Sequence, residues 1–346
     1  MKPLAVVWRP VARVWRALRT RIDHFLARRP HRSFRTTRRR DYVRPLQMPG
    51  YWSFTGSVFS MLWKHKKMVS GLLAVYAVLT VTFVGLASQE TYTQLSETLQ
   101  ATGGNLFEGQ WGQVGQASLL LLGGVSGSLA TAPTPAQQIY AGLLILLMWL
   151  TIVWLLRAIM AGQRPRLRDG IYNAGAPLVP MFLVSLLLIV QLLPVALAAI
   201  GYGAAVATDL LSGGVEAMLF WAVAGLMVCL SLYWVTSTLF ALIVVTLPGM
   251  YPMRAIRTAG DLVAGRRLRI LYRLMWMGLL VAVAWVVVVV PIILFATWLN
   301  TAWPATSWMP IVPLALLIMS ALSLVWTASY VYLLYRKVVD DDAAPA

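Results

Sequence analysis

The sequence predicts an all-α fold: a polytopic transmembrane helical bundle of six spans, arranged as three hairpins with cytoplasmic amphipathic lead-in helices. Of its 346 residues, 59% are hydrophobic, and the mean hydropathy is +0.72. Only 12% are charged, which is about half the usual share of a soluble domain. A soluble fold of this length cannot bury so much apolar surface, so the bilayer must solvate it.

Six apolar runs are long enough to cross a bilayer, for which a helix needs roughly 20 residues. They cover residues 68–87, 139–156, 178–206, 217–246, 274–299 and 311–335. Pro194 and Pro291 lie inside the third and fifth runs, where we expect a kink rather than a break. A shorter apolar segment, 117–132, is rich in Gly and Ser and is expected in the first outer loop, as either an interfacial or a re-entrant helix.

The positions of the basic residues predict the orientation. Seventeen of the 29 Lys and Arg lie at or before Lys67, and the others fall in two loops and after the last span. The three alternate loops, 88–138, 207–216 and 300–310, contain no Lys or Arg. The positive-inside rule therefore predicts that both termini and both basic loops are cytoplasmic.

Each hairpin is expected to begin with an amphipathic lead-in, at residues 51–67, 158–177 and 251–273. Apolar residues recur at helical spacing in the first of these. In the third, the sequence predicts that Ile256, Val263, Ile270 and Leu271 face lipid while the neighbouring arginines face phosphates.

The chain divides into three regions. Residues 1–50 are expected to form a basic amphipathic helix and an Arg-rich cytoplasmic arm, 51–337 the six-span membrane domain, and 338–346 an acidic cytoplasmic tail. The arm flanks an interfacial helix and a span, so we expect it to bind anionic lipid headgroups. One alternative is that the positive charge of the arm serves only to set the topology of the chain in the membrane. Contact with RNA is another, which we do not favour because no nucleic-acid-binding motif accompanies the arm.

Two groups of candidate site residues follow. The lipid-headgroup candidates are the arginines of the arm and the two basic loops: Arg38, Arg39, Arg40, Arg164, Arg166, Arg168, Arg254, Arg257, Arg266, Arg267 and Arg269. Polar residues inside spans suggest an intramembrane polar groove made by Gln191, Thr236, Ser237 and Thr238. Hydrogen bonding between helices is the alternative explanation for this second group.

The sequence contains no pattern typical of ion coupling, catalysis or metal binding. No Asp, Glu, Lys, Arg or His lies well inside a span, which argues against an ion-coupled transporter or pump. The common hydrolase, zinc-protease and phosphate-loop motifs are missing, so no catalytic residue is predicted. Cys229 is the only cysteine, and His24, His31 and His65 lack metal-ligand spacing. We therefore expect no metal and no cofactor.

Two loops carry a resemblance. The segment 157–170 resembles a connector of pattern R…G.RP.LR.A, and 255–270 resembles one of pattern A.R.S..L..GR..RI. Both occur in the YciC-like group of uncharacterised six-span bacterial membrane proteins, and the membrane domain of glycerophosphodiester phosphodiesterases is similar. Thr258 and Ala259 stand where that pattern often has Ser. Because the 346 residues include no soluble phosphodiesterase domain, the resemblance implies a shared architecture in a bacterial plasma membrane, and not phosphodiesterase activity.

Three functions are compatible with these features. The favoured hypothesis is a non-enzymatic integral membrane protein that engages anionic lipid, or organises the membrane, through its basic cytoplasmic loops. Its expected partners are membrane lipids, and a cytoplasmic protein partner is left open. One alternative is the permease subunit of an ATPase-driven transporter, with 254–273 as the coupling helix. The third, an intramembrane enzyme acting on lipid, is disfavoured because no acid or base lies at membrane depth.

Overall fold

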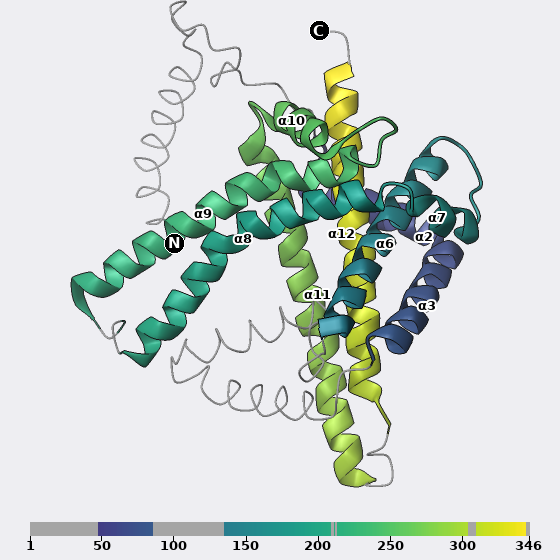
Figure 1. Ribbon diagram of the computed structural model, residues 1–346. Coiled ribbons are helices and arrows are strands. Elements are labelled where there is room, and N and C mark those ends of the chain that lie inside the picture. Colours follow the sequence, from purple (N-terminus) through teal and green to yellow (C-terminus); the bar gives the residue numbers. More distant parts are fainter. Residues whose placement is uncertain (1–47, 86–134, 209–210, 212, 304–308, 344–346) are drawn as a thin grey trace, which may run out of the picture.

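The computed structural model describes residues 48–85, 135–208, 211, 213–303 and 309–343. Within these ranges the chain forms nine α-helices and no strand (Figure 1). The helices are α2 (Tyr51–Lys64), α3 (Lys66–Phe83), α6 (Pro135–Met160), α7 (Leu167–Ala174), α8 (Leu178–Ala207), α9 (Gly214–Val244), α10 (Pro252–Val263), α11 (Arg267–Ala302) and α12 (Ile311–Ala343). The predicted helix and arm of residues 1–47 and the segment 117–132 lie outside the described residues.

Six of these helices are long and apolar enough to cross a membrane, which confirms the predicted six spans and the all-α class. They are α3, α6, α8, α9, α11 and α12. Helices α8 and α11 run without interruption through Pro194 and Pro291. The last helix continues to Ala343, so the start of the predicted acidic tail prolongs α12.

The spans pair as the three predicted hairpins, α3 with α6, α8 with α9, and α11 with α12. The short helices α2, α7 and α10 precede them as lead-ins. The second and third lead-ins are shorter than predicted, because α6 continues to Met160 and α11 already begins at Arg267. Gly265 lies between α10 and α11 with a φ of +80°, a conformation that glycine adopts without steric cost.

Helices α6 and α12 form the centre of the bundle. In the apolar window of each, 44% of the residues are buried, against 6% for α3 and α8. Helix α12 packs against α2, α3, α6, α9 and α11. The main core includes Val153, Phe240, Tyr330 and Leu334, all almost fully buried.

The α8–α9 hairpin extends obliquely away from α11 and α12 (Figure 1). Its outward surface carries large exposed apolar side chains such as Ile200, Met218 and Leu226. Water would solvate such a surface poorly, whereas the hydrocarbon interior of a membrane suits it. The molecule is a multi-pass membrane protein.

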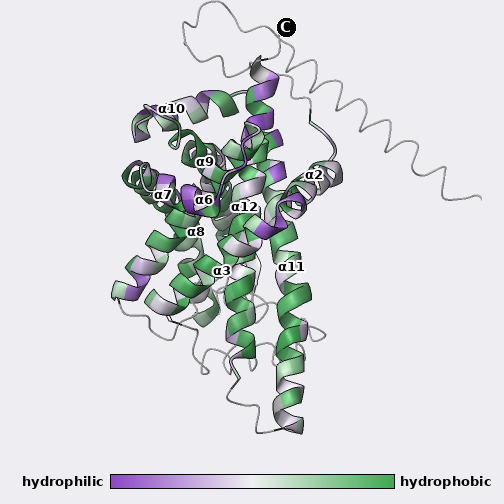
Figure 2. Cartoon of the chain, turned by 90° about the vertical axis from the view of Figure 1, so that its right-hand side faces the viewer, coloured by the Kyte–Doolittle hydropathy of each residue, from purple (hydrophilic) through white to green (hydrophobic). Residues whose placement is uncertain are grey.

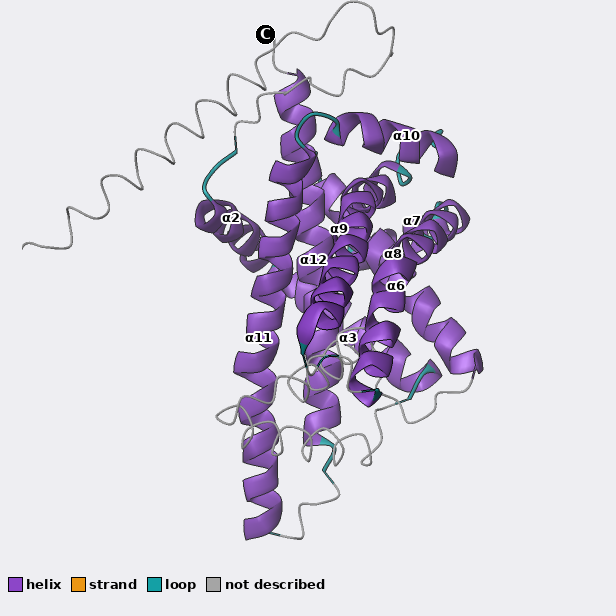
Figure 3. Ribbon diagram, turned by 90° about the vertical axis from the view of Figure 1, so that its left-hand side faces the viewer, coloured by secondary structure: helices purple, strands orange, loops and turns teal. Residues whose placement is uncertain are grey.

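Charge is concentrated at one end of the bundle. Every described Lys and Arg lies at the end where α3, α8 and α11 begin and where α6, α9 and α12 end, which we call the basic end. Figure 2 shows hydrophilic residues gathered there, around α2, α7, α10 and the end of α12. In the described residues the opposite end contains Glu216 and no Lys or Arg. Helices joined by short loops make up the part of the chain that the structure describes (Figure 3). This helical bundle has apolar sides and one strongly basic end.

Candidate functional site

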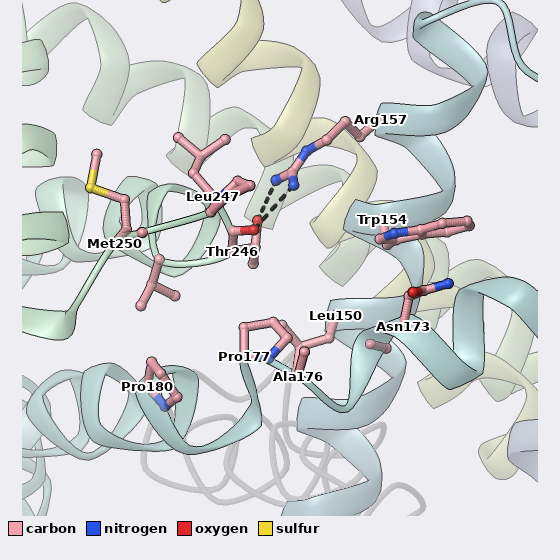
Figure 4. Close-up of a pocket in the computed structure, with 14 residues that line it drawn as sticks. Leu150, Trp154, Arg157, Asn173, Ala176, Pro177, Pro180, Thr246, Leu247 and Met250 are labelled. Atoms are coloured by element: carbon pink, nitrogen blue, oxygen red, sulfur yellow. Dashed lines mark hydrogen bonds between the residues drawn. The ribbon is translucent and has the colours of Figure 1, made fainter.

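A cavity of about 410 Å³ opens at the basic end, where three parts of the chain meet (Figure 4). The last turns of α6 contribute Trp154 and Arg157, and α7 contributes Asn173. The turn between α7 and α8 contributes Pro177, and residues 245–250, which follow α9, close the remaining side. Segments that are far apart in the sequence therefore build this cavity, which we call the Arg157 pocket.

Arg157 is the one charged residue among the described residues that line this pocket. Its guanidinium donates to the Thr246 carbonyl oxygen at 3.1 Å and also to the Thr246 hydroxyl. These two bonds tie the end of α6 to the end of α9. A guanidinium carries five N–H donors, and Thr246 accepts two of them, so donors remain for an anion.

The sequence that follows α9 places Thr246. The Thr246 hydroxyl donates to the carbonyl of Ile243 at 2.7 Å, so the last turn of the helix orients it. Pro248 and Gly249 then turn the chain away toward α10, and Gly249 has a φ of +72°. A side chain at that position would be strained, which makes glycine well suited to this turn.

The walls of the Arg157 pocket are mostly apolar. Leu150, Trp154, Pro180 and Met250 line it, and none of the described lining residues is acidic. A single cation beside apolar walls suits a phosphate or carboxylate that belongs to an amphipathic molecule.

Most of the predicted headgroup arginines that the structure describes surround this end as exposed side chains. Arg164, Arg166 and Arg168 are exposed between α6 and the first turn of α7. Arg254 and Arg257 lie on the exposed face of α10, and Arg269 is exposed in the first turn of α11. Arg267 is partly buried, with its guanidinium 3.9 Å from the centre of the Tyr233 ring on α9. The predicted Arg38, Arg39 and Arg40 lie outside the described residues.

The prediction that Arg266 faces lipid headgroups is wrong. Only 2% of this residue is exposed, so it lies inside the protein and does not face headgroups. Its Nε donates to the Leu262 carbonyl at 2.9 Å, and its Nη1 lies 3.8 Å from Oδ2 of Asp341 on α12. The reason is that the chain folds back between α10 and α11, which places the start of α11 against the end of α12.

The predicted lipid-facing side of the same loop also differs. Ala255, Ala259 and Val263 are fully buried along one face of α10, which packs on α9 and α8. Ile270 is fully buried as well. Neighbouring helices, not lipid, cover Val263 and Ile270, while Arg254 and Arg257 stay on the open face.

The structure brings together one pair from the predicted polar groove. The Thr238 hydroxyl on α9 lies 2.6 Å from Oε1 of Gln191 on α8 and donates to it. Thr236 donates to the carbonyl of Leu232, and Ser237 to that of Trp234, both within α9. The three hydroxyl donors are therefore engaged inside the protein, and the Gln191–Thr238 pair matches the interhelical alternative.

Arg273 is a structurally important residue that the sequence analysis did not single out. It is 7% exposed, and its guanidinium donates to the Pro49 carbonyl. The guanidinium also lies 4.8 Å from the ring centre of Tyr51 and 5.5 Å from that of Phe54. The sequence signal that could have found it is its spacing: Arg273 follows Ile270 by three residues and precedes Met277 by four, so the three share one side of α11, and all three are buried.

In the described residues, no group of three or more His, Cys, Asp or Glu could hold a metal ion. Comparison of the chain with protein-family models, with curated proteins and with solved structures found no match. The chemistry of the basic end is therefore the guide to the function of this protein.

Proposed function

We propose that this chain is a non-enzymatic integral membrane protein that engages anionic lipid headgroups at its basic end, in the cytoplasmic leaflet of a bacterial plasma membrane. The observation that carries the proposal is the charge distribution. All described Lys and Arg lie at one end of a bundle whose sides are apolar. Basic clusters next to membrane spans attract anionic lipids, at about 1 kcal/mol for each Lys or Arg near the surface.

The Arg157 pocket gives this attraction a defined position. One side of it is α7, which carries Arg168 and follows Arg164 and Arg166. The other side is the loop that leads into α10, the helix that carries Arg254. A headgroup phosphate at Arg157 would take up guanidinium donors that Thr246 leaves available, while apolar walls contact the rest of the molecule.

The test compares the intact chain with a charge-removal variant in bilayers. Arg164, Arg166 and Arg168 are exposed, so replacing all three by Gln should leave the packing intact. We expect the preference for anionic over zwitterionic spin-labelled lipid to fall by up to about 3 kcal/mol, roughly 100-fold. Replacing the same three residues by Lys is the matched control, because it keeps the charge. Added salt should weaken the preference of the unmodified chain.

An unchanged lipid preference in the Gln variant, together with insensitivity to salt, would contradict this proposal.

A second candidate function is supported by α10, which packs across α8 and α9 while Arg254 and Arg257 stay exposed. A permease subunit would present such a helix to its ATPase. Purification of the intact chain from its native membrane with a stoichiometric ATPase would favour this second function.

A further inference from the structure

A second cavity, of about 590 Å³, lies on another side of the bundle, away from the Arg157 pocket. Helices α3 and α11 both pack on α12, and the cavity lies between them with α12 as its floor. Residues of α2 line its upper end. Figure 2 shows α2 above α3 and beside the upper part of α11. We call this cavity the α3–α11 groove.

The groove is apolar along most of its length. Its floor includes Met319 and Ser323 of α12, and its walls include Leu73 of α3 and Ala284 of α11. The hydroxyl of Ser323 accepts the indole N–H of Trp285 at 2.8 Å and donates to the Met319 carbonyl at 2.7 Å. The one hydroxyl group on the floor is therefore satisfied within the protein, and the largely apolar surface that remains suits hydrocarbon.

The upper end of the groove is polar and cationic. Lys66 and Ser70 line it near the junction of α2 and α3, which belongs to the basic end, and Thr55 of α2 also lines the groove. The Lys66 ammonium lies 5.0 Å from the centre of the Trp63 ring, a cation–π contact that holds the charge beside the groove. Among the described residues that line the groove, none is acidic.

We propose that the α3–α11 groove binds one anionic phospholipid, with an acyl chain in the groove and the headgroup phosphate paired with Lys66. The length of the groove is similar to the depth of one leaflet. Its α11 wall runs from Leu280 to Val288, which is about 12 Å at the rise of an α-helix. One leaflet of hydrocarbon is about 15 Å deep. The charge suits an anionic headgroup, because Lys66 is the one charged residue among the described residues that line the groove, and it lies at the headgroup end. This inference builds on the proposed lipid engagement but concerns a different site.

The first test fills the groove. Ala284→Leu adds bulk to the α11 wall, and Ala282→Leu adds the same bulk at an exposed position of α11 outside the groove. Native mass spectrometry of the intact chain released from phosphatidylglycerol nanodiscs would count the retained lipids. We expect the unmodified chain and the Ala282→Leu variant to retain one lipid that Ala284→Leu binds at least tenfold more weakly.

The second test removes the charge. Lys66 lines the groove and the adjacent Lys67 does not, so Lys67→Gln is the matched control for Lys66→Gln. In mixed phosphatidylglycerol and phosphatidylcholine nanodiscs, we expect Lys66→Gln to lose the phosphatidylglycerol preference of that one lipid at least fivefold, and Lys67→Gln to keep it. Lys66 is exposed, so its replacement should not disturb folding. Lys66→Gln therefore still tests the site if Ala284→Leu fails to fold.

Equal retention of the lipid by Ala284→Leu and Ala282→Leu would overturn the site. Equal phosphatidylglycerol preference of Lys66→Gln and Lys67→Gln would overturn the headgroup assignment. Neither result depends on Arg164, Arg166 and Arg168, which do not line the groove. The lipid site in the groove can therefore be disproved while the lipid preference that those arginines produce persists. Loss of that preference with retention of the groove lipid is the reverse outcome, and the same experiments distinguish it.

Discussion

Three arginines at the basic end connect helices instead of facing solvent. Arg157 joins α6 to α9 through Thr246, Arg266 joins α11 to α12 beside Asp341, and Arg273 joins α11 to the residues that begin α2. Removing a guanidinium from water is costly unless hydrogen bonds, carboxylates or aromatic faces replace the lost solvent. Each of these arginines has at least one such replacement, so each contributes to the geometry of the bundle.

Arg273 gives a prediction at the scale of one residue. Arg273→Lys keeps the charge but loses the planar group that reaches Pro49 and lies over the rings of Tyr51 and Phe54. We expect α2 to be held less firmly, by about 1–2 kcal/mol. Hydrogen exchange of the α2 amides in detergent should accelerate correspondingly.

The control for this prediction is Arg269→Lys, which changes an exposed arginine on the same helix. Its α2 amides should exchange at the rate of the unmodified chain. Identical exchange in both variants would show that Arg273 does not anchor α2.

At the scale of elements, charge stabilises the third hairpin at its basic end, and apolar packing stabilises it toward the opposite end. Arg266 at the start of α11 lies 3.8 Å from Asp341 near the end of α12. Further along, Trp285, Val289 and Ile293 of α11 pack with Val312 and Leu316 of α12 in a second core cluster. The two helices are therefore held together at both ends of their contact.

The ion pair predicts a difference between two adjacent aspartates. Asp341→Asn removes the carboxylate beside the buried Arg266, and disrupting a buried pair costs about 3 kcal/mol. Asp340→Asn removes the same charge from an exposed position. Thermal unfolding in detergent should show a clearly lower Tm for Asp341→Asn than for Asp340→Asn, and equal values would contradict a stabilising role for the pair.

At the scale of the whole molecule, apolar sides and one basic end predict a fixed orientation. By the positive-inside rule we expect the basic end to face the cytoplasm. In a Cys229→Ser background, a cysteine can be introduced by Arg168→Cys at the basic end or by Glu216→Cys at the opposite end, both exposed positions. A membrane-impermeant maleimide should label the Glu216→Cys variant in intact cells.

The Arg168→Cys variant should react with the same maleimide only after the membrane is permeabilised. The reverse pattern would place the basic end outside and would remove the basis for lipid engagement in the cytoplasmic leaflet.

The sequence by itself determined the six spans, their pairing into hairpins, the short helices that precede them and the concentration of basic residues at one end. Span formation depends on the hydropathy of a local run, and alternating loop charges can be read directly along the chain. Exposed arginines such as Arg164, Arg254 and Arg257 were also identifiable, because they lie in polar connectors or on the polar side of an amphipathic helix.

Only the tertiary structure decided which apolar faces meet protein and which meet lipid. Periodicity marks Val263 and Ile270 as apolar but does not say what covers them. Arg157 and Thr246 are 89 positions apart, and Arg273 and Pro49 are 224 positions apart, so their contacts exist only once the helices have packed. The Arg157 pocket and the α3–α11 groove arise in the same way, because each is a space between helices that no local run of residues encodes.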